Sequence, residues 1–112
     1  MKVYLGKKSI EIPVRKLGYF GKGTGLMFRN KETRNLLFDF NTDGKRAIHS
    51  YFVFFNFLAI WFDERNNLVE FKIVKPFTLS IVPSKNYRKL VEVPVNSKNR
   101  KIIDFFVGKG NI

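Results

Sequence analysis

Hydrophobic residues are densest in the middle of the chain. Between Ile48 and Phe62 only a few polar residues interrupt aromatic and aliphatic side chains, and Leu68 to Ile73 then alternates apolar with polar positions. The two stretches are separated by the polar run Asp63 to Asn67. Dense β-branched and aromatic residues favour strands, and alternation is typical of a half-buried strand. The pattern predicts a central hairpin of Ser50 to Trp61 and Leu68 to Val74.

Shorter strands are predicted before this hairpin. Lys2 to Leu5 and Ser9 to Val14 flank Gly6-Lys7-Lys8, which is typical of a tight hairpin turn. Four glycines between residues 18 and 25 disfavour a helix and indicate an irregular connection over 15–25. Leu36 to Phe40 alternates as a strand, and Asn41 to Gly44 has the composition of a turn.

The C-terminal third is also predicted to consist of short elements joined by loops. Tyr87 to Val95 is expected to be a strand, with loops at 82–86 and 96–101 on either side. Ile102 to Val107 is expected to form a single helical turn and then a strand. About seven short strands predict a mainly β, small single-domain antiparallel β-barrel-like fold, with under about one-fifth helix.

Length and composition exclude several classes of protein. A chain of 112 residues is one domain, 1–112, and without cysteine it has no disulfides, thiolate catalysis or cysteine-bound metal. Its longest apolar run, Tyr51 to Phe62, is shorter than the roughly 18 residues of a membrane span. The first eight residues contain no apolar stretch able to serve as a signal peptide. We therefore expect a cytoplasmic protein with no membrane contact.

The charge balance points to an anionic partner. Lys and Arg number 21 against 9 Asp and Glu, which gives a formal net charge of +12. Such a charge attracts polyanions and keeps like molecules apart, so it fits either a nucleic-acid or phosphate surface or a surface that only serves solubility. The glycine-rich loop 21–25 could present backbone amides to an anion beside neighbouring basic side chains. The candidate anion-binding residues are Lys22, Arg29, Arg34, Lys45 and Arg46.

The sequence contains few other candidates for catalytic or ligand-binding residues. His49 is the single histidine, so it is either a hydrogen-bonded structural residue or a ligand-contacting group. Ser50 beside it is a poor nucleophile candidate because adjacent residues of a strand point to opposite faces. The 18 aromatic side chains could stack on single-stranded nucleic acid, but alternating positions favour packing in the core.

Short motifs in a fixed order resemble a known family. They are GLMFR at 25–29, LLFDF at 36–40, HSYFVFF at 49–55, FDE at 62–64, VE at 69–70, KPF at 75–77, LVEVP at 90–94 and VG at 107–108. Over about residues 15–112 the chain resembles the archaeal branch of the domain of unknown function 192 family, also called uncharacterised protein family 0127. The resemblance implies a mostly β, barrel-like fold with little helix and implies no activity.

Three positions depart from the family's pattern. Asn56 and Leu58 stand where relatives usually have proline and aspartate, and Lys109 replaces a common aspartate. If those acids formed a site in relatives, this chain has lost it. Hard divalent cations need carboxylate oxygens, so we expect no metal site and no cofactor.

We interpret the chain as a non-catalytic binding or accessory module that recognises nucleic acid or another anionic ligand. The alternatives are a small enzyme with its site near His49 and a structural protein whose charge serves solubility. If the chain binds a polyanion, replacing Arg29 and Arg34 should weaken binding more than replacing Lys98 and Lys101, because the first pair lies beside the glycine-rich loop.

Overall fold

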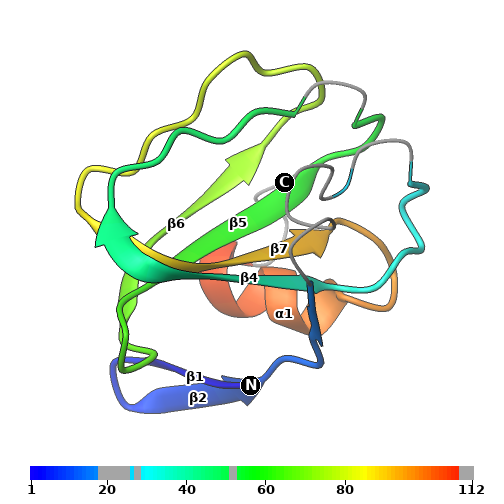
Figure 1. The fold of residues 1–112 in the computed structure, drawn as a ribbon. Coiled ribbons are helices and arrows are strands. Elements are labelled where there is room, and N and C mark those ends of the chain that lie inside the picture. Colours follow the sequence, from blue (N-terminus) through cyan, green and yellow to red (C-terminus); the bar gives the residue numbers. More distant parts are fainter. Residues whose placement is uncertain (18–25, 27–28, 51–52, 109–112) are drawn as a thin grey trace.

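The computed structural model describes residues 1–17, 26, 29–50 and 53–108 (Figure 1). One helix and seven strands are found in these residues. They are β1 (Lys2–Leu5), β2 (Lys8–Glu11), β3 (Arg15–Lys16), β4 (Leu36–Gly44), β5 (Phe57–Phe62), β6 (Leu68–Val74), β7 (Tyr87–Pro94) and α1 (Arg100–Val107). The prediction of a mainly β chain with under one-fifth helix is confirmed, since α1 has only eight residues.

The strands form two sheets. β1 and β2 make an antiparallel hairpin, while the other five strands have the order β3-β4-β7-β5-β6. All neighbours in the large sheet are antiparallel except β3 and β4, which are parallel. The mainly β fold class is as predicted, but the sheets are not closed into a barrel: β3 and β6 are the edges of the large sheet. Closure needs strands that pair along their lengths around the whole ring, and β3 has only two residues to offer.

The central hairpin is shorter than predicted at its first strand. β5 pairs with β6 from Phe57 and Val74 to Phe62 and Leu68. Upstream, Ile48 forms an isolated antiparallel bridge with Ile81, so this part of the chain pairs with the segment after β6 and does not extend β5. Residues 51 and 52 lie outside the described part of the chain.

Two other expectations are corrected. Asn41 to Gly44 belongs to β4, although the pairing with β7 shifts register there and Asn41 has φ of 63°. The last apolar segment is wholly helical, without a final strand. Its residues Ile102, Ile103 and Phe106 have the spacing of one helical face and bury that face on the sheet. Burial of this apolar face against the sheet stabilises a helix here, in place of the predicted strand.

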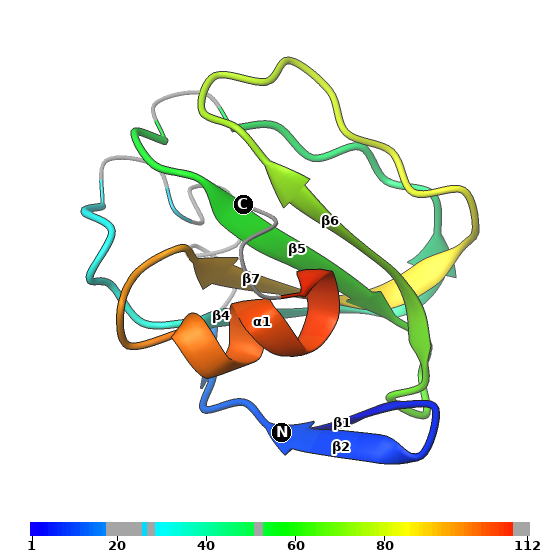
Figure 2. The ribbon, with the colours of Figure 1, turned by 180° about the vertical axis from the view of Figure 1, so that it is seen from behind.

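Both faces of the large sheet are covered. On one face, α1 and the β1–β2 hairpin pack on Leu58, Ile60 and Val91 (Figure 2). On the other, side chains from the connections, such as Val53 and Ile81, pack on Phe57, Ala59, Trp61 and Leu90. β5 is therefore buried along its entire length, which explains its uninterrupted apolar sequence.

Candidate anion-binding surfaces

The five cations proposed from the sequence do not form one cluster. Arg34 lies just before β4, whereas Lys45 and Arg46 lie just after it (Figure 1). Nine residues of extended chain separate these points by roughly 25 Å at about 3.3 Å per residue, allowing for the irregularity in β4. Arg29 is half-buried, with its backbone N–H donating to the Leu26 carbonyl at 3.2 Å. Lys22 lies outside the described residues.

Arg46 is held by the protein itself. Its guanidinium carbon lies 4.5 Å from the centre of the Phe40 ring and 5.5 Å from that of Tyr87. The guanidinium donates to the Tyr87 carbonyl at 3.3 Å, to the Thr42 hydroxyl at 2.6 Å and to the Thr42 carbonyl. In return the Tyr87 hydroxyl, whose pKa is raised by burial, donates to the Arg46 carbonyl at 3.0 Å. Arg46 thus anchors the start of the loop that Lys45 and His49 share.

Ser50 locks two loops together. It is fully buried, and its hydroxyl donates to the Lys75 carbonyl at 2.7 Å and accepts from the Thr78 N–H. Its backbone N–H donates to the Thr78 carbonyl at 2.9 Å, and its own carbonyl accepts from the Phe77 N–H at 2.8 Å. The neighbouring His49 is exposed. Ser50 therefore has a structural role in holding the two loops together.

The locked loops expose apolar side chains. Of the five large hydrophobic residues exposed in the described part of the chain, four lie here: Phe54 (63%), Phe77 (49%), Leu79 (68%) and Val82 (51%). The Phe54 and Phe77 rings meet edge to face, with their centres 5.4 Å apart. Phe77 has φ of 57°, a conformation that bulky residues rarely adopt. We call residues 45–50, 53–54 and 75–82 the loop platform.

The loop platform is also free of acid. The sequence has no Asp or Glu between Asp43 and Asp63, nor between Glu70 and Glu92. Lys45 and Lys75 are exposed on the loop platform. Sequence reasoning considered stacking aromatics but placed most rings in the core, because an exposed and a buried Phe look alike in a dense apolar run.

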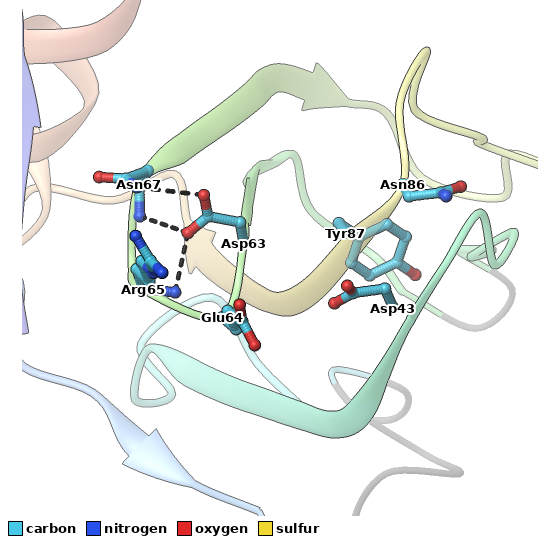
Figure 3. Close-up of a pocket in the computed structure, with 7 residues that line it drawn as sticks. All are labelled: Asp43, Asp63, Glu64, Arg65, Asn67, Asn86 and Tyr87. Atoms are coloured by element: carbon cyan, nitrogen blue, oxygen red, sulfur yellow. Dashed lines mark hydrogen bonds between the residues drawn. The ribbon is translucent and has the colours of Figure 1, made fainter.

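A first hollow lies where the ends of β4 and β5 meet the start of β7 (Figure 3). It has a volume of about 290 Å³ and is lined by Asp43, Asp63, Glu64, Arg65, Asn67, Asn86 and Tyr87. The Asp63 carboxylate accepts from the backbone N–H groups of Arg65 and Asn67, both at 2.9 Å, and from the Asn67 amide at 3.1 Å. Partial burial raises the pKa of Asp63, but these hydrogen bonds outweigh it and the net pKa is lowered. Asp63 therefore serves the hairpin turn.

The expectation about metals stays a prediction. In the described part of the chain no three His, Asp or Glu side chains come together in a way that could hold an ion. Of the positions that depart from the family's pattern, Leu58 is fully buried in the core and Asn56 is exposed, with its carbonyl accepting from the Val95 N–H at 2.9 Å. Lys109 is outside the described residues.

A second hollow of about 340 Å³ brings Arg34, one of the predicted cations, together with Lys98, which was not among them. It is lined by Pro13, Val14, Thr33, Arg34, Asn35, Lys98 and Asn99. The sequence analysis treated Lys98 as belonging to a loop remote from Arg34. Contacts between distant parts of the chain bring the two side chains to one hollow. No pattern in the sequence predicts these contacts. His49 lines neither of these two hollows.

Glu92 is a buried ionisable residue that the sequence analysis did not single out. It lies in the centre of the sheet between Leu36 of β4 and Ala59 of β5, and it is only 6% exposed. Burial raises its pKa to about 8, so the carboxyl is mainly protonated at neutral pH. On the same face the buried Trp61 indole meets the Tyr87 ring edge to face, with the ring centres 6.3 Å apart. The burial of Glu92 and Trp61 cannot be predicted from neighbouring residues. Alternation shows only which residues of a strand lie on the same face, and it does not show what covers that face.

A comparison with protein families decides the family. Residues 18–104 match the model of domain of unknown function 192, described as "Uncharacterized ACR". The chain belongs to the DUF192 family. The resemblance found in the sequence is confirmed at the level of the family, while membership of the archaeal branch stays a prediction. A comparison with curated proteins gave no match.

Two solved structures share the DUF192 fold seen here. A "putative transcription regulator" from Sinorhizobium meliloti 1021 has a TM-score of 0.75 and 11% identity, with 90% of this chain and 81% of that chain covered. A protein of unknown function from Novosphingobium aromaticivorans DSM 12444 has a TM-score of 0.74 and 10% identity, covering 90% and 75%. At these identities the likeness shows the fold alone. No helix in the described residues is long and apolar enough to cross a membrane.

Proposed function

We propose that this chain is a non-catalytic module that binds single-stranded nucleic acid, and that the loop platform is its contact surface. The observation that carries the proposal is the exposed pair of Phe54 and Phe77 on a surface that has lysines and no acid. Exposed rings together with cations are the two components of a sequence-tolerant groove for single strands.

The aromatic pair supplies the stacking component. The two rings meet edge to face, and both remain about half exposed or more, so part of each ring is open to contact at the surface. Stacking on one base is worth about 1 to 3 kcal/mol by alanine substitution, or roughly five- to 150-fold in affinity. The Ser50 hydrogen bonds hold the loop of Phe77 beside residues 48–50, so the position of that ring is set before binding.

The electrostatic component follows from the distribution of charge. Lys45 and Lys75 are exposed, and none of the residues that make up the loop platform is acidic. Neutralising phosphates with lysines releases counterions, so affinity should fall steeply as salt rises and depend little on sequence. Arg46 contributes by ordering the loop on Phe40 and Tyr87. An acidic protein partner would share the charge requirement but would not need stacking rings.

Fluorescence anisotropy with a labelled single-stranded oligonucleotide over a salt series tests the proposal. Phe54→Ala and Phe77→Ala should each weaken binding about fivefold or more. The matched control is Tyr4→Ala, which removes a 59% exposed ring with Lys2 lying 5.6 Å above it, on the separate β1–β2 hairpin. That variant should bind like the parent.

A second pair of variants separates a site from a diffuse field. Lys45→Ala with Lys75→Ala removes the same charge as Lys7→Ala with Lys8→Ala, and all four lysines are exposed. The first double variant should lower both the affinity and the salt slope, the slope by about one for each phosphate that is no longer neutralised. Equal effects of both double variants, or no binding at about 50 mM salt, would overturn the proposal. Oligonucleotide binding that needs the lysines but is unchanged by Phe54→Ala and Phe77→Ala would show that charge alone holds the strand, and it would overturn the stacking part of the proposal.

A further inference from the structure

The two edges of the large sheet are protected to different degrees. β3 has two residues, Arg15 and Lys16, and both are exposed and basic. β6 has seven residues and contains neither proline nor glycine, and Lys72 is its one exposed residue (Figures 1 and 2). Short, charged edge strands resist pairing with another chain, whereas a longer edge strand is a template for such pairing. β6 is therefore the edge at which a further strand can be added.

The outer backbone groups of β6 have no partner in the described part of the chain. β6 pairs with β5 on one side, and no hydrogen bond between described residues joins its backbone to any other segment. In an edge strand, every second residue directs its N–H and C=O away from the sheet. Ser84 contacts the strand through the Glu70 side chain, whose Oε1 accepts from the Ser84 N–H at 3.1 Å and from its hydroxyl at 2.6 Å. These bonds leave the outer backbone groups available to an added strand.

The charges of β6 are complementary to those of a second copy of β6. When two copies pair antiparallel about a two-fold axis at Phe71, each Glu70 lies opposite Lys72 of the other chain. Lys72 takes part in none of the salt bridges found between described residues. Glu70 retains Oε2 for this contact, since both bonds from Ser84 go to Oε1. The two-fold axis repeats the contact, so two pairs of opposite charge form.

Apolar side chains reach the same edge on the face that α1 covers. The Phe71 ring lies 5.3 Å from the Phe106 ring of α1, and Phe106 lies 5.0 Å from Phe105, between ring centres. Phe106 is buried, but Phe71, Ile73 and Phe105 are only half-buried. Pairing about Phe71 brings the two Phe71 side chains opposite each other, and an aromatic pair across two strands contributes roughly 0.2 to 1 kcal/mol.

We propose that this chain forms a homodimer in which two β6 strands pair antiparallel about Phe71, so that the two large sheets become one continuous sheet. Such a two-fold contact uses the same surface on both chains, so association stops at the dimer. The net charge of +12 opposes association, but β6 carries one acid and one base and is neutral as a whole. At about 0.15 M salt, exposed charges more than roughly 8 Å apart are largely screened.

Sedimentation velocity of the full chain at about 0.15 M salt, from about 5 to 500 µM protein, tests the dimer. The parent should pass from monomer to dimer within this range. Lys72→Glu should remain a monomer, because carboxylates then lie opposite each other across the two strands. Lys31→Glu is the matched control, since it makes the same change at an exposed position before β4, away from β6 (Figure 1). This control should dimerise like the parent.

A mixture of two variants tests the register. Glu70→Lys alone should also be a monomer, because lysines then lie opposite each other. In a mixed dimer of Lys72→Glu with Glu70→Lys, each carboxylate of one strand lies opposite an ammonium of the other. The equimolar mixture should therefore dimerise although neither variant does so alone. Circular dichroism and thermal unfolding verify that both variants fold, because Glu70→Lys also loses the bonds from Ser84.

Three results would overturn the proposal. A parent that stays monomeric up to about 500 µM has no dimer of this kind. Undiminished dimerisation of Lys72→Glu, or a monomeric mixture of two folded variants, would exclude pairing about Phe71. Loss of the dimer in Phe54→Ala or Phe77→Ala would assign the contact to the loop platform, whereas we expect both variants to dimerise like the parent. No oligonucleotide is present in this experiment, so the dimer and the nucleic-acid proposal fail independently.

Discussion

Glu92 should make the protein less stable as pH rises through neutrality. Its carboxyl has an ordinary pKa of 4.5 and a pKa of about 8 in the folded state, because burial disfavours the charged form. Between these values the folded chain keeps a proton that the unfolded chain has lost. The free energy of unfolding therefore falls with pH over this window and levels off above about pH 8.

The magnitude follows from the two pKa values. At about 1.4 kcal/mol for each pH unit, the change from 4.5 to about 8 corresponds to a loss on the order of 5 kcal/mol. That is comparable to the whole stability of many small domains. Glu92→Gln has nearly the same shape and no titration, so it should lose none of this stability between pH 5 and 9.

Urea unfolding at pH 5, 6, 7, 8 and 9 measures the effect. The single tryptophan, Trp61, is fully buried and gives a fluorescence signal, and circular dichroism gives a second probe of two-state behaviour. The quantity of interest is the difference in unfolding free energy between Glu92→Gln and the parent, because any fixed cost of the new amide cancels from its pH dependence. This difference should grow in favour of the variant by several kcal/mol from pH 5 to 8.

Glu70→Gln is the control variant, because the pKa of Glu70 is shifted in the opposite direction to that of Glu92. Hydrogen bonds from Ser84 lower the pKa of Glu70, so its contribution is present above pH 4.5 and is lost only in acid. The difference between Glu70→Gln and the parent should stay constant from pH 5 to 9. A constant difference for Glu92→Gln as well would refute the reasoning, since it would mean that the carboxyl is hydrated in the folded state.

Three further predictions concern the framework. Ser50→Ala removes the hydroxyl bonds to Lys75 and Thr78 in a buried site and should cost about 2 to 4 kcal/mol in urea unfolding, whereas a cost under about 1 kcal/mol would show that the backbone bonds suffice. Asp63→Ala should cost about 1 to 2 kcal/mol at pH 7, and the cost should shrink in acid as the pH falls through the lowered pKa of the parent carboxyl; a cost that does not change between pH 7 and strong acid would contradict its role as a charged acceptor. Millimolar Mg²⁺, Ca²⁺ or Mn²⁺ should leave the thermal midpoint unchanged, and a clear rise would reveal a site that the sequence analysis rules out.

The sequence by itself determined the local structure and the family. The turn at Gly6, the second strand of the central hairpin and the strand from Tyr87 follow from alternation and turn residues, which are properties of neighbouring positions. The ordered motifs identified the DUF192 family without any contact being known. The turn predicted at Asn41 to Gly44 is wrong. These residues have the composition of a turn, but pairing with β7 extends β4 through them.

Only the tertiary structure decided which residues share a surface. It exposes Phe54 while burying Val53 and Phe55 on either side of it, and it brings Lys98 to Arg34 from the other end of the chain. It also buries Glu92, because residues from the connections cover that face of the sheet. Periodicity tells which side of a strand a residue occupies. What covers that side depends on segments remote in sequence, and a local pattern holds no information about them.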